Sequence, residues 1–132
     1  MNTEEALIRA FVEPSMRARL VGFLSSPTER PRLRAELTHA RYLDRRFAQT
    51  ISDAHRTPAE IEDLLRTMGA PETCELVSED EDLDGLELRL RDALEWVVGS
   101  GMATFVSCIP GKLAYFEGDD PEQRYILERG AG

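Results

Sequence analysis

The chain contains few of the side chains from which metal centres and covalent active sites are built. It has two cysteines and two histidines in 132 residues, too few at the required spacing for a zinc site. Both cysteines, Cys74 and Cys108, lie in apolar, strand-like stretches, and a secreted disulfide scaffold would be smaller and richer in cysteine. We therefore expect two buried free thiols, although a bridge between neighbouring strands stays open as an alternative.

Long apolar runs are also missing. No stretch approaches the length of a membrane span, and residues 1–5 do not show the basic-then-apolar order of a signal peptide. We expect no membrane partner and a cytoplasmic location. No linker, repeat or low-complexity tract divides the chain, and its length is that of one domain, so we expect a single domain over residues 1–132.

Lysine is almost absent, and charge is unevenly distributed. Residues 1–56 hold ten arginines and seven acidic residues, a net charge of +3, whereas residues 57–132 hold six basic and eighteen acidic residues, a net charge of −12. The sum is the −9 of the whole chain, which makes nucleic acid an unlikely partner because nonspecific binding requires cations. The arginines of residues 27–41 could contact an anion or RNA locally, but we favour their pairing with the acidic half or with solvent.

The most informative segment is residues 104–117, in which two apolar stretches flank Pro110 and Gly111. Proline presets the φ angle of the first central turn residue, and glycine tolerates the positive φ of the second. The pattern predicts a β-hairpin with strands at about residues 102–109 and 112–117. Because both strands are apolar on both faces, we place them at the centre of a sheet that is covered on both sides.

Helical periodicity predicts helices at about residues 3–12, 14–24, 27–41, 58–68 and 89–98. Thr3 is the expected cap of the first helix and Ser26 that of the third. The fourth helix is specified most strongly, because Thr57 and Glu60 match a capping box and Gly69 can end the helix in a left-handed conformation. We expect residues 52–56 to form a loop.

Further strands are predicted at residues 46–51, 73–78 and 123–129, the first with Phe47, Gln49 and Ile51 on one face. The order of elements predicts an α+β fold: N-terminal helices packed with a four- to five-stranded mixed or antiparallel sheet that ends in a C-terminal β-meander. If the strands at 73–78 and 102–109 are neighbours, the helix between them would make them parallel.

Two patterns point to chemistry without completing it. Asp80, Asp82, Asp84 and Gly85 match the first half of an EF-hand calcium loop, but its twelfth position is Arg91 and a strand precedes it. We therefore expect no metal and no cofactor. The glycines of residues 99–101 and 110–112 lack the following helix that a phosphate cradle needs.

Covalent catalysis has equally little support, and we name no catalytic residue. Cys108 lies between apolar neighbours, where burial would keep its thiol neutral. Neither His39 nor His55 is placed beside it by the sequence. We regard an enzyme as the less favoured class.

The remaining polar cluster suggests a binding face. Lys112 could form the polar tip of a surface with Tyr115, Glu117, Asp119 and Asp120. The favoured hypothesis is a small acidic binding protein that regulates or neutralises a protein with a basic surface, steered by the acidic clusters at 79–84 and 117–122. The alternative is a small-molecule-binding domain or enzyme with a site near Cys108 and Lys112.

Overall fold

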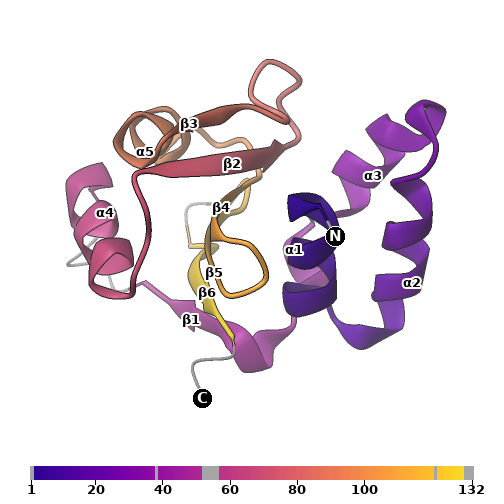
Figure 1. Cartoon of the computed structure of the whole chain (residues 1–132), viewed down its shortest axis with the longest axis horizontal. Helices are drawn as coiled ribbons and strands as arrows, with labels where there is room; N and C mark the ends of the chain where they lie inside the picture. Colours follow the sequence, from indigo (N-terminus) through magenta and orange to yellow (C-terminus); the bar gives the residue numbers. More distant parts are fainter. Residues whose placement is uncertain (1, 38, 52–56, 121, 130–132) are drawn as a thin grey trace.

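A computed structural model describes residues 2–37, 39–51, 57–120 and 122–129. Helices cover both faces of one sheet, with α1 to α3 on one side and α4 and α5 on the other (Figure 1). The helices are α1 (Thr3–Phe11), α2 (Pro14–Phe23), α3 (Arg30–Leu37), α4 (Pro58–Thr67) and α5 (Leu90–Val97). Short 3₁₀ turns lie at η1 (Pro27–Glu29), η2 (Ala40–Tyr42) and η3 (Arg45–Phe47).

The described residues form a six-stranded sheet with the order β1-β6-β5-β4-β2-β3, in which every neighbouring pair is antiparallel. The α+β class is confirmed, but six strands replace the expected four or five. Strands β4, β5 and β6 are neighbours in chain order, yet β1 and β2 flank them, so the sheet as a whole is not a meander. The strands are β1 (Ala48–Thr50), β2 (Thr73–Ser78), β3 (Glu87–Arg89), β4 (Thr104–Ile109), β5 (Leu113–Glu117) and β6 (Arg124–Glu128).

The expectation of a parallel pair was wrong. Strands β2 and β4 are neighbours but antiparallel, with Leu76 opposite Val106. The reason is β3, which the sequence did not reveal: it turns back beside β2 before α5 begins. Strands β3 and β4 therefore run in the same direction, with β2 inserted between them.

The central hairpin is confirmed. The Lys112 N–H donates to the Ile109 carbonyl oxygen at 2.9 Å, and Gly111 has a φ of 73°. Every residue of β5 is buried, as expected for a strand with helices on both sides. Tyr115 and Phe116 point to opposite faces and belong to two different cores.

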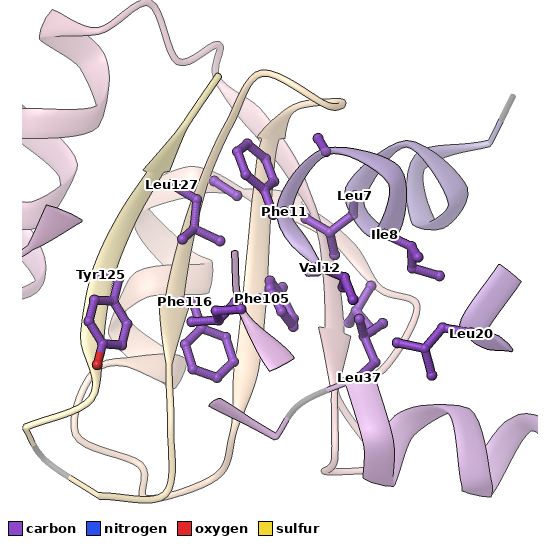
Figure 2. Close-up of a cluster of buried hydrophobic side chains, with 14 of the residues drawn as sticks. Leu7, Ile8, Phe11, Val12, Leu20, Leu37, Phe105, Phe116, Tyr125 and Leu127 are labelled. Atoms are coloured by element: carbon purple, nitrogen blue, oxygen red, sulfur yellow. The ribbon is translucent and has the colours of Figure 1, made fainter. Parts of the chain in front are cut away.

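The first core lies between the sheet and the N-terminal helices (Figure 2). Leu7 and Phe11 of α1 meet Phe105 and Phe116 of the hairpin, whose rings lie 4.6 Å apart between centroids. Each such fully buried side chain stabilises the fold by about 1.5–3 kcal/mol. This core fixes the N-terminal helices on the sheet.

The second core lies under α4 and α5. Ile61, Leu65 and Leu94 pack there against the opposite face of the sheet, together with both cysteines. Cys74 and Cys108 are buried and free, as expected. The helix α4 also agrees with prediction: Thr57 and Glu60 form the capping box, and Gly69 follows with a φ of 103°.

Several predicted helix ends were wrong. The side chain of Asn2, not Thr3, caps α1 by accepting the Glu5 N–H at 2.7 Å. The Ser26 side chain caps no helix, because a 3₁₀ turn intervenes before α3, which ends at Leu37 rather than near residue 41.

Strand β1 is shorter than predicted, and its expected face is not formed. Phe47 packs against the first core, whereas Ile51 belongs to the second. Phe47 belongs to the turn η3 and not to the strand. The alternation of side chains between the two faces of a strand therefore does not extend to Phe47. The loop predicted at 52–56 lies outside the described residues.

Candidate functional site

An acidic loop, residues 79–85, joins β2 to β3, and its own carboxylates shape it. Asp84 Oδ1 accepts a hydrogen bond from the Ser78 N–H at 3.0 Å. Asp84 Oδ2 accepts one from Arg30 Nη2 at 2.8 Å. Asp80 accepts the Asp82 N–H at 2.9 Å. Helix α3 thus holds the acidic loop by a contact between segments far apart in the sequence.

A groove of about 540 Å³ lies between the acidic loop, β3 and the C-terminal part of α5. We call it the Trp96 groove. Its apolar surface comes from side chains of all these segments and of the residues that follow α5, and its polar groups lie on the loop and at Ser100. The lining residues are Asp80, Asp82, Leu83, Leu86, Leu88, Trp96, Ser100 and Met102.

Trp96 and Leu86 are the large apolar side chains most open to solvent among the described residues, at 66% and 40% exposure. The buried side of α5 is formed by Leu90, Ala93, Leu94 and Val97. Trp96 lies beside this stripe rather than on it, so folding leaves its ring uncovered. Contiguous exposed apolar surface of this kind is typical of interaction sites.

Two carboxylates that line the Trp96 groove, Asp80 and Asp82, have no counter-charge among the described residues, and we call them the rim carboxylates. Arg34 reaches Glu81 at 3.4 Å, and Arg30 pairs with Asp84. By contrast, no arginine or lysine of the described residues lies within ion-pair distance of Asp80 or Asp82. An apolar surface beside carboxylates that no described cation pairs with suits a cationic, partly apolar ligand.

Two of the predicted binding residues come together, but inside the protein. The Tyr115 hydroxyl donates to Glu117 Oε1 at 2.8 Å, and the Gly99 N–H donates to Glu117 Oε2 at 2.9 Å. Arg124 Nε lies 3.3 Å from Glu117 Oε1 as its ion-pair partner. Since Glu117 is only 1% exposed, this network ties the end of α5 to the sheet.

The other predicted binding residues lie apart. Lys112 is exposed at the opposite end of β5 from Glu117, five residues or about 17 Å along an extended strand. Asp119 and Asp120 are exposed in the turn after β5. The five residues therefore do not form one face, because β5 separates Lys112 from the others and buries Tyr115 and Glu117.

At the alternative site near Cys108 and Lys112, neither described cysteine is an activated nucleophile. Burial raises the pKa of the Cys108 thiol to about 12 and that of Cys74 to about 11, so both are protonated at neutral pH. The His39 ring lies 5.7 Å from the Tyr42 ring, and His55 is outside the described residues.

The calcium-loop pattern has a different use in the fold. Asp84, which would be a cation ligand in an EF-hand, accepts a hydrogen bond from Arg30. Asp80 accepts one from the backbone N–H of Asp82 in its own loop. The described part of the chain contains no group of three or more histidine, cysteine, aspartate or glutamate side chains placed to hold a metal ion.

No family model, curated protein or solved structure matches the chain. None of the described helices has the length and apolar character needed to cross a membrane.

Because no comparison assigns a site, the candidate site rests on the geometry of this structure alone. Sequence reasoning missed Trp96 and Leu86, although one signal was present: the chain's only tryptophan lies off the apolar stripe of an amphipathic helix.

Proposed function

We propose that this protein is a binding module for a protein partner with a basic surface, and that the Trp96 groove and the acidic loop form its binding surface. The observation that carries this proposal is the pairing of an open apolar groove with two rim carboxylates, Asp80 and Asp82, that have no ion-pair partner among the described residues. Tryptophan dominates many interfaces because its large ring loses much water-accessible surface on binding.

Charge supports a basic partner over a second copy of the chain. The chain has a net charge of −9. In a symmetric dimer formed through the Trp96 groove, the carboxylates of the two copies would lie close together and repel each other. A basic partner would instead be attracted over a distance of about one Debye length, 8 Å at physiological salt. The exposed Asp119 and Asp120 would add to this attraction, whereas Glu117 would not, because it is buried against Arg124.

The test uses the emission of Trp96, which is the only tryptophan and lines the groove. A panel of short peptides that combine apolar and cationic residues in different orders is titrated into the protein. We expect a subset to shift or quench the emission, and we expect their affinity to fall by about tenfold or more when salt is raised.

The matched variants separate a local charge effect from a global one. Asp80→Asn with Asp82→Asn should weaken binding about tenfold or more. Asp63→Asn with Glu128→Gln removes the same net charge from exposed residues that do not line the groove, and it should change affinity little. Failure of every peptide to bind, or equal losses in both double variants, would overturn the proposed function.

A further inference from the structure

Arginine and aromatic rings form a repeated pair on this protein's surface. The partly exposed rings of Phe23, Tyr42 and Phe47 each have at least one guanidinium over them, with carbon-to-centroid distances between 4.5 and 5.4 Å. Trp96 is more exposed than any of these, yet no guanidinium of the described residues lies over it. Tryptophan is the aromatic side chain that binds cations best, and in the described part of the chain its ring has no cation over it.

At two of these rings the stacked guanidinium is also paired with a carboxylate. Arg46 lies over Phe47 and contacts Asp44 at 2.7 Å. Arg19 lies over Phe23 and contacts Glu36 at 2.9 Å. A planar guanidinium can do both at once, because its face meets the ring while its edge donates to the oxygens.

The Trp96 groove contains the ring and the carboxylates of this arrangement but no guanidinium from the described chain. We propose that it receives an arginine side chain from a protein segment of the partner, with the guanidinium against Trp96 and its edge toward Asp80 and Asp82. This inference rests on the proposed function, and it names the residue that the partner supplies.

Other side chains fit the groove less well. The methylene groups of an arginine would cover Leu86 and Leu88, as long charged side chains cover apolar surface elsewhere. Lysine presents a compact, strongly hydrated charge that stacks poorly and cannot bind a carboxylate in bidentate fashion. An apolar side chain would fill the floor but leave the rim carboxylates without a cation while removing water from around them.

The experiment compares four peptides that differ at one position. A short segment with lysines at its ends carries arginine, lysine, citrulline or norleucine at its centre, and binding is followed by anisotropy of a dye on the peptide. We expect the arginine peptide to bind about tenfold tighter than the lysine peptide, and tighter still than the citrulline and norleucine peptides. Free arginine, titrated separately, should bind much more weakly than the peptide.

Two substitutions test the ring directly. Trp96→Leu keeps an apolar side chain but no ring, and should reduce the preference for arginine over lysine to about twofold or less. Trp96→Phe keeps a ring and should retain part of that preference. Because Trp96 is exposed on the surface of α5, neither substitution removes a core contact.

The outcomes distinguish the two proposals. Suppose that the arginine and lysine peptides bind equally well and that Asp80→Asn with Asp82→Asn weakens both. This result would support a partner with a basic surface but would refute the proposal that the groove receives an arginine side chain. Equally tight norleucine binding would also refute it. If free arginine bound as tightly as the peptide, the occupant would be a small molecule and not a protein segment. No binding by any of the four, together with failure of the wider panel, would overturn the proposed function itself.

Discussion

Glu117 is the residue whose surroundings differ most from what its chemistry suggests. A carboxylate that the sequence places among apolar strand residues is almost fully enclosed, with a tyrosine hydroxyl, a backbone N–H and an arginine around it. A buried charge is tolerated only when such partners satisfy it. Glu117 is therefore part of the framework and not of a binding surface.

The first prediction concerns this buried pair. Glu117→Gln leaves the largely buried Arg124, whose Nε is enclosed, without its counter-charge. We therefore expect a loss of about 3 kcal/mol in the free energy of unfolding, measured by urea denaturation. Tyr115→Phe removes the hydrogen bond to Glu117 and keeps the ion pair, so it should cost about 1 kcal/mol. A glutamine variant as stable as the parent would show that the pair contributes nothing to folding.

Asp44 predicts how stability depends on pH. It is buried, and hydrogen bonds from the Arg46 side chain, with further help from Arg17, hold its pKa below the usual value. A carboxyl group whose pKa is lowered by folding stabilises the protein above its unfolded pKa of about 3.9, and this contribution is lost as pH falls through the folded pKa.

We therefore expect Asp44→Asn to be less stable than the parent by a constant amount between about pH 5 and 7. The difference should shrink below about pH 4, as seen in urea denaturation at a series of pH values. Glu128→Gln, at an exposed carboxylate without a described ion-pair partner, is the control. A difference that persisted unchanged to pH 2 would contradict the role given to the Asp44 charge.

At the scale of elements, sequence patterns predicted those with strong local signals. The helix α4 has a capping box and a terminating glycine, and the hairpin of β4 and β5 has a proline–glycine turn between apolar strands. The edge strand β3 was missed because three residues, Glu87–Arg89, cannot display a two-residue alternation. Its absence from the prediction reversed the expected direction of β2 relative to β4.

The candidate groove could not be predicted for a related reason. It is formed by the acidic loop, β3 and α5, and the loop's position depends on Arg30, which is 54 residues away from Asp84 in the chain. Sequence spacing carries no record of such a contact. The acidic loop itself, and the possibility that Arg-rich residues 27–41 pair with the acidic half, were visible in the charge pattern.

The contact between α3 and the acidic loop gives a prediction at this scale. Arg30→Met keeps much of the side chain's length but removes its ion pairs with Glu4 and Asp84. We expect the loop to open more often, so that amide exchange at Ser78 and in residues 79–85 becomes faster while the core strands are unaffected. Unchanged exchange in the loop would show that Arg30 does not hold it and that the remaining contacts, such as the Ser78–Asp84 bond and the Arg34–Glu81 pair, are sufficient.

At the scale of the whole molecule, the sheet separates two cores, and the acidic loop at its edge meets the helices of one side through Arg30 and Arg34 of α3. The arginine-rich helices α2 and α3 lie on one side, and the acidic loop, β3 and α5 surround the Trp96 groove. Many of the arginines lie over aromatic rings or against carboxylates of the protein itself. Asp80 and Asp82, at the groove rim, have no arginine or lysine of the described chain within ion-pair distance, and this difference is the basis of the proposed function.

The most direct test of that claim is a map of backbone amide chemical shifts as the arginine-containing peptide is added to the isotope-labelled protein. The account predicts that the largest changes fall in residues 79–88 and 96–102, with an additional change at the indole N–H of Trp96. Changes concentrated instead on α2 and α3, or around Lys112 at the far end of β5, would contradict it.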